Sequence, residues 1–115
     1  MTHEEIEQIE ISKAEAEKAI SKGEALKRLL ENPDYTLVIS EGFFKEYPNE
    51  LALAIANNTG AYNSDVLVEC LKGINVLKGY EFKVAGNYDA GVQDLKAIED
   101  YIAQSVNSDD SEDEE

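Results

Sequence analysis

The chain has 115 residues, with 25 Asp and Glu against 10 Lys and Arg, a formal net charge of −15, one His and one Cys. So few imidazole and thiol groups argue against a clustered metal site and against Cys-His or Ser-His catalysis, and the negative charge disfavours binding to nucleic acid or anionic membranes. A chain of this length suits one domain.

The first segment, residues 1–23, is expected to be an extended N-terminal helix. Thr2 and Glu5 have the spacing of a capping box, and acidic residues crowd the first turns, where the helix dipole favours them. The stripe at alternating spacings of three and four is thin and Ala-rich, which predicts an exposed helix or a weak coiled coil that could join two copies. Its members are Ile6, Ile9, Lys13, Ala16, Ile20, Gly23, Lys27 and Leu30. We expect Gly23 to end this helix and residues 24–31 to begin another.

The next segment opens at Asn32, which can cap a helix with Pro33 in its first position. The run from Thr36 to Ile39 is also good strand sequence, so a short strand is the alternative there. Pro48 should hold Tyr47 outside the helical region and open a further helix over residues 49–57.

Two longer helices are expected to follow as an antiparallel pair. The first begins at Ser64, and a break at Gly86 and Asn87 separates it from the second, which runs to Val106. Their expected inward faces comprise Val66, Leu67, Cys70, Leu71, Ile74, Leu77 and Phe82 in the first, and Tyr88, Val92, Leu95, Ile98, Tyr101, Ile102 and Val106 in the second.

The last nine residues, Asn107 to Glu115, carry six acids and no base. Such a block repels itself and has no apolar side chain to bury, so we expect it to be disordered. The predicted fold is therefore all-α: a small bundle of four to five helices with an extended N-terminal helix and a disordered acidic tail. The expected divisions are residues 1–23, the helical core domain 24–106, and the tail 107–115.

Candidate chemical sites have simpler structural interpretations. Carboxylates at solvent-facing spacings do not form the desolvated pair that acid–base catalysis needs. The stretch from Gly86 to Gly91 lacks the spacing and Lys of a phosphate loop and is interpreted as a turn. Asn57 opens a glycosylation sequon, but no signal peptide precedes it. We expect no catalytic residues, no metal and no cofactor, and hence no enzymatic activity.

Aromatic residues are the better candidates for binding, because with no Trp they are the largest anchors available to an interface. Tyr47 and Tyr62 fall in expected loops and are candidate contacts with a protein partner. Phe43 and Phe44 follow Gly42; they are expected to reach the core and are the remaining interaction candidates. The other tyrosines (Tyr35, Tyr80, Tyr88 and Tyr101) are expected on inward faces.

Part of the sequence resembles small acidic helical proteins of tailed bacteriophages. The resemblance covers about Ala25 to Gln104 and depends on Ala25 to Tyr35, on Gly42-Phe43-Phe44, and on Gly73, Leu77 and Tyr80; Pro48 departs from the pattern. Genes for such proteins often lie near virion structural genes. The resemblance implies a virion or assembly accessory and carries no catalytic residues over.

Two functions follow as hypotheses. In the first, the protein is a non-enzymatic phage accessory that binds a phage structural protein, or one with a basic surface, through an apolar helix face. In the second, its acidic surface mimics nucleic acid and inhibits a host DNA-binding enzyme. With no membrane-spanning segment expected, we place it in the cytoplasm of the infected bacterial host, with packaging in the virion left open.

Overall fold

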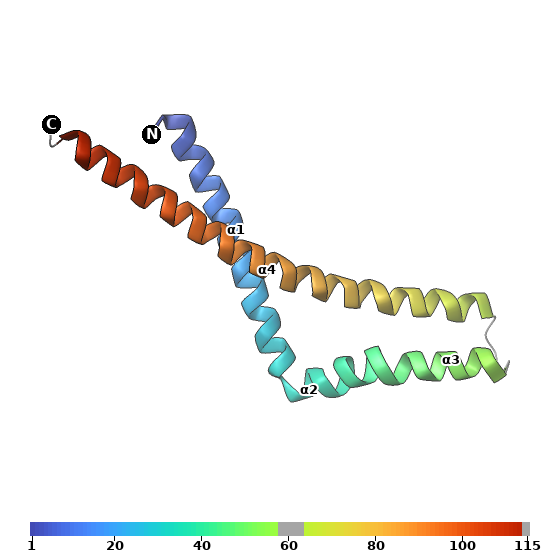
Figure 1. Cartoon of the computed structure of the whole chain (residues 1–115). Helices are drawn as coiled ribbons and strands as arrows, with labels where there is room; N and C mark the ends of the chain where they lie inside the picture. The colour runs from blue at the N-terminus through green and yellow to red at the C-terminus, as the bar shows by residue number, and fades with distance from the viewer. Residues whose placement is uncertain (58–63, 114–115) are drawn as a thin grey trace. The chain divides into compact units, whose positions relative to one another are not determined.

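The computed structural model describes residues 1–57 and 64–113, with side chains described as far as residue 106. These residues form helices and no strand, so the all-α prediction is confirmed. Figure 1 shows the elements in chain order. They are α1 (His3–Glu31), α2 (Pro33–Tyr35), the π-helix η1 (Thr36–Glu46), α3 (Tyr47–Asn57) and α4 (Ser64–Asp113).

The described residues contain fewer separate helices than the four to five predicted. The elements α2, η1 and α3 follow one another without a break, which leaves three helical segments in the described chain. The expected ends at Gly23 and at Gly86–Asn87 are wrong, because α1 and α4 continue through them. The expected antiparallel pair is therefore one helix. A single glycine in a helix costs about 1 kcal/mol relative to alanine, which flanking helix formers can offset.

The helix starts predicted at Thr2 and at Asn32 are confirmed. The Glu5 backbone N–H donates to Thr2 Oγ1 at 3.1 Å, and the Thr2 N–H donates to Glu5 Oε2 at 3.4 Å, which completes a capping box. The Asp34 N–H donates to Asn32 Oδ1 at 2.9 Å, and Pro33 follows the cap. The strand alternative for residues 36–39 is wrong, because they lie in η1.

The helix continues through Pro48, contrary to expectation, and Tyr47 has helical dihedral angles (φ −64°, ψ −46°). Proline lacks an N–H, and in an α-helix its ring clashes with the carbonyl four residues back. Here the turns before Pro48 are π-helical: the Tyr47 N–H donates to the carbonyl of Gly42, five residues back. We attribute the tolerance of Pro48 to this wider turn, which displaces the carbonyls that its ring would otherwise meet.

Contacts divide the chain into two compact units: unit 1 comprises Met1–Glu24 with Val84–Glu115, and unit 2 comprises Ala25–Lys83. In unit 2 the segment α2–η1–α3 packs beside the first part of α4 (Figure 1). Leu51, Leu67 and Ile74 are its buried core. Packed against them are Phe43, Phe44, Ala54, Ile55, Cys70 and Leu71, so the inward placement of the two Phe residues and Cys70 is confirmed.

In unit 1 the N-terminal part of α1 packs antiparallel to the C-terminal part of α4. Two contacts set the direction: Gly23 lies against Tyr88, whereas Gly91 lies against Ala16, Ala19 and Ile20. Small side chains let the two backbones approach closely, since a β-carbon at Gly91 would lie only 3.0 Å from the carbonyl oxygen of Ala16. The stripe of residues on α1 that was predicted to be exposed is therefore partly covered by α4, and Ala16 is only 5% exposed.

Several residues expected to face inward are exposed instead. Each described helix packs against a neighbour on one side, so only a narrow strip of its surface is covered. Leu67 and Ile74 lie on such a strip in α4, but side chains to either side of it remain in solvent. The exposed residues are Val66, Leu77, Tyr80, Phe82, Val92, Tyr101 and Val106.

Two predictions lie outside the described residues. Tyr62 and most of the sequon at Asn57 fall in residues 58–63. The acidic tail falls where side chains are not described, although the backbone of α4 is described to Asp113, so its disorder and the boundaries of the three predicted divisions stay predictions. Within the described ranges, no helix has the length and apolarity needed to cross a bilayer.

Candidate functional site

Of the predicted interaction residues, the structure describes Phe43, Phe44 and Tyr47. The two Phe rings, 5.7 Å apart, pack against the core of unit 2. Tyr47 lies in a helix and not in the expected loop, but it is 39% exposed and its ring stacks on Phe43 at 6.1 Å. Tyr47 therefore presents an exposed surface that a partner could contact, whereas Phe43 and Phe44 pack against the core and Phe43 holds the Tyr47 ring in place.

A set of apolar side chains on α4 is also exposed. Val76, Leu77 and Tyr80, here called the α4 stripe, are 73%, 38% and 51% exposed. Positions three and four apart are neighbours on a helix surface, so Val76 and Leu77 each adjoin Tyr80. Leu77 and Tyr80 were expected to face inward. They are exposed because, among the described residues of unit 2, α4 is packed on one side only.

Unit 2 also contains a polar contact between distant parts of its sequence. The Tyr35 hydroxyl donates to Glu81 Oε1 on α4. Desolvation by burial raises the pKa of Glu81 above its ordinary value of 4.5. The contact joins α2 to α4 and links two parts of unit 2 that lie 46 residues apart in the sequence.

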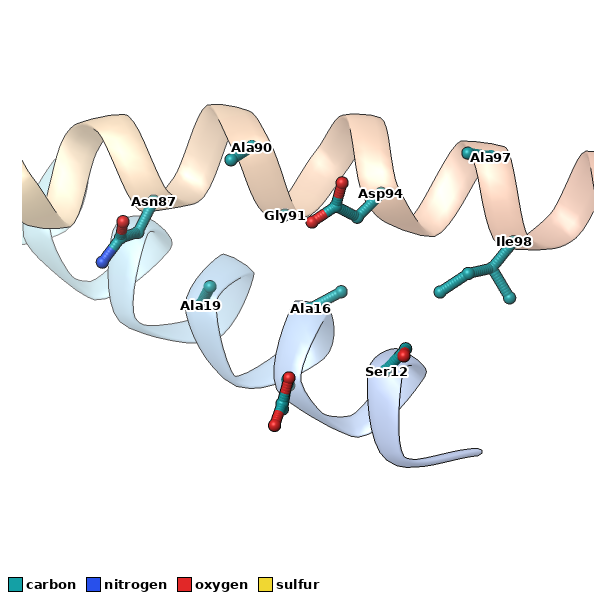
Figure 2. Close-up of a pocket in the computed structure, with 10 residues that line it drawn as sticks. Ser12, Ala16, Ala19, Asn87, Ala90, Gly91, Asp94, Ala97 and Ile98 are labelled. Carbon is teal, nitrogen blue, oxygen red and sulfur yellow. The ribbon is translucent and has the colours of Figure 1, made fainter. Parts of the chain in front are cut away.

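Unit 1 contains an open groove of about 580 Å³ between α1 and α4. Figure 2 shows Ala16 and Ile98 directed into the space between the two helices, with Gly91 and Ala90 on α4 nearby. The lining consists of Ser12, Glu15, Ala16, Ala19, Asn87, Ala90, Gly91, Asp94, Ala97 and Ile98. This groove was not predicted from the sequence, although Ala and Gly residues recur at helical spacing on both segments.

Charge is distributed very unequally between the two units. Unit 1 has 4 Lys and Arg against 17 Asp and Glu, a net charge of −13, whereas unit 2 has 6 against 8, a net charge of −2. The imbalance does not depend on the tail, because residues 1–24 with 84–106 alone have 4 bases against 11 acids. Unit 1 is therefore the part that would attract a basic partner.

The described residues contain no group of three or more His, Cys, Asp or Glu side chains placed to hold a metal ion. No family model, curated protein or solved structure matches this chain. What remains as a basis for function is the chemistry of two surfaces, the α4 stripe of unit 2 and the acidic groove of unit 1.

Proposed function

We propose that this protein is a non-enzymatic accessory that binds another protein, with the α4 stripe as its main apolar contact. The observation that carries the proposal is the exposure of Val76, Leu77 and Tyr80 beside the core formed by Leu51, Leu67 and Ile74. Grouped apolar side chains in water commonly mark interaction sites, and Tyr is enriched among residues that dominate binding energy. Tyr47, on α3 of the same unit, is a secondary contact.

The resemblance to small acidic proteins of tailed bacteriophages gives this proposal a setting. In it, the partner is a virion structural or assembly protein of the same phage, met in the cytoplasm of the infected host. The near-neutral charge of unit 2 suits an apolar contact of this kind, since little charge has to be desolvated there.

A photo-crosslinking phenylalanine analogue at position 76 tests the proposal in infected cells. We expect a crosslink to a capsid, portal or tail protein, and its loss when Leu77→Ser and Tyr80→Ala are added. The double variant Leu37→Ser/Val38→Ser is the matched control, because these side chains are also exposed (70% and 62%) but lie on η1. A crosslink that survives both sets of changes, or none at all, overturns the proposal.

The charge of unit 1 favours a second candidate, a nucleic-acid mimic that occupies a host DNA-binding enzyme. Mimicry places carboxylates where phosphates would bind, so its binding should weaken steeply with salt. Crosslinking from position 99 of unit 1 to a host nuclease or polymerase, together with steep salt dependence, would support it. Binding that is insensitive to salt favours the apolar contact.

A further inference from the structure

We propose that the groove of unit 1 binds a basic amphipathic helix of the partner protein. The inference rests on the proposed protein-binding function and adds a second contact site with its own chemistry. Helix-in-groove recognition is a common way for one protein to hold another.

The charge of the groove selects a basic occupant. Glu15 on α1 and Asp94 on α4 line opposite walls, and no Lys or Arg lines this groove. Neither carboxylate has an ion pair within the described part of the chain. Lys18 and Lys22 line a smaller neighbouring recess of about 260 Å³, which shares Glu15, Ala19 and Asn87 with the groove.

The floor of the groove suits a helix. It is formed largely by small side chains on both walls, including Ala16, Ala19, Ala90 and Ala97, so the backbone of a third helix can approach closely. Because the side chains that line the groove are small, the bound helix has to supply the large apolar side chains that fill it. A partner helix would place Leu or Ile on its inner side and Lys or Arg at its flanks, within reach of Glu15 and Asp94.

A second copy of this chain does not fit that description. Its unit 1 has the same net charge of −13, so two such units repel each other. Unit 2 of a second copy is not basic either, with a net charge of −2, so we assign the groove to a basic segment of a different protein.

A fluorescent Leu/Lys helical peptide of about 18 residues, roughly 27 Å of helix, serves as the probe. We expect it to bind the full chain in an anisotropy titration, and an otherwise identical Leu/Glu peptide not to bind. Glu15→Gln/Asp94→Asn should weaken binding about tenfold, because two exposed ion pairs are lost. Glu17→Gln/Asp100→Asn removes the same charge from the same two helices outside the groove and should change affinity less than twofold.

Filling the groove provides a test that leaves charge unchanged. Ala97→Trp places a large ring in the groove and should abolish peptide binding, whereas Ala103→Trp on the same helix should not. Circular dichroism of each variant establishes that α1 and α4 remain helical. If both double charge variants weaken peptide binding equally, or if Ala97→Trp leaves binding unchanged, the groove is not the binding site. If the Leu/Lys peptide does not bind at all, the proposal of a basic helical partner is wrong.

These outcomes are separable from those of the proposed function. Crosslinking at position 76 reports on the α4 stripe and involves no groove residue. A virion protein captured there by a chain that does not bind the Leu/Lys peptide overturns the groove inference alone. Peptide binding without any crosslink at position 76 overturns the stripe as the main contact.

Discussion

Gly23 of α1 lies directly against the side chain of Tyr88 of α4. A β-carbon added at Gly23 would be only 2.3 Å from Tyr88 Cβ and 2.6 Å from Cγ, far inside van der Waals contact. The glycine that was expected to end the first helix is thus the residue that lets α1 and α4 cross in unit 1.

Gly23→Ala should destabilise unit 1 in spite of alanine's better helix propensity. The methyl group forces α1 and α4 apart, and overpacking of this kind costs about 1–3 kcal/mol. Gly73→Ala is the control, since nothing lies within 4 Å of a β-carbon there, and it should stabilise α4 by about 0.5–1 kcal/mol. Urea unfolding followed by circular dichroism measures both. Equal gains in the two variants would contradict the close crossing.

The core of unit 2 predicts a contrast between two neighbours on α4. Ile74 is 4% exposed and Val76 is 73% exposed. Ile74→Ala should lower the free energy of unfolding by about 2–5 kcal/mol, because it leaves a cavity beside Leu51 and Leu67. Val76→Ala should change it by less than about 0.5 kcal/mol. Chemical denaturation of both variants checks the difference, and similar losses would mean that α4 faces another way.

Glu81 predicts a pH dependence of stability. Burial raises its pKa above 4.5, so between 4.5 and the higher value of the folded chain the folded state binds more protons than the unfolded state. Stability from this group is therefore present at acidic pH and lost as pH rises through the folded pKa. Glu81→Gln should match the parent chain below pH 4.5 and become the more stable of the two above it. Parallel melts across this range make the comparison; a constant difference would argue against the shift.

Tyr35→Phe tests the contact with Glu81 from the other side. Without the hydroxyl, the carboxylate loses a hydrogen bond to its charged form, so the pKa of Glu81 should rise further. We expect a loss of about 1 kcal/mol in the free energy of unfolding at neutral pH. Carbon-13 NMR titration of the Glu81 carboxyl group measures the pKa change directly. Tyr80→Phe, on the exposed stripe, provides a control that should leave this pKa unchanged.

Pro48→Ala tests the link between proline and the π-helical turns. Alanine restores an N–H and removes the ring, which in a helix interior is worth up to about 3 kcal/mol. We expect a more stable segment with α-helical hydrogen bonds in place of the bond from Tyr47 to the carbonyl of Gly42. Amide hydrogen exchange of Tyr47 follows that bond. Retention of the π-helical pattern would show that Pro48 is not its cause.

The all-α class and the helix starts at Thr2 and Asn32 were predictable because their causes are local. Thr2 with Glu5, and Asn32 with Pro33, satisfy backbone donors within a few residues, so the signal lies in the sequence itself. Continuity was not predictable in the same way. Gly86 and Gly91 look alike in sequence, yet Gly86 faces open space and Gly91 meets the carbonyl of Ala16.

The candidate surfaces were harder to foresee than the helices. Ile74 and Leu77 belong to the same periodic apolar pattern, and only the position of the α2–η1–α3 segment decides that the first is buried and the second exposed. The groove depends on Ala16 and Gly91 meeting across 75 residues of sequence. A contact between residues this far apart depends on the tertiary fold and cannot be predicted from a short stretch of sequence.

The close contact of α1 and α4 at Gly23 and Gly91 also limits which substitutions this sequence can accept during evolution. A mutation there to any other amino acid meets a steric barrier at once, whereas codons 73, 79 and 86 can change without displacing a neighbour. Distant descendants of the same gene should therefore keep glycine at positions 23 and 91 and lose it at positions 73, 79 and 86. That unequal retention would identify kin whose overall identity has fallen too low to be recognised.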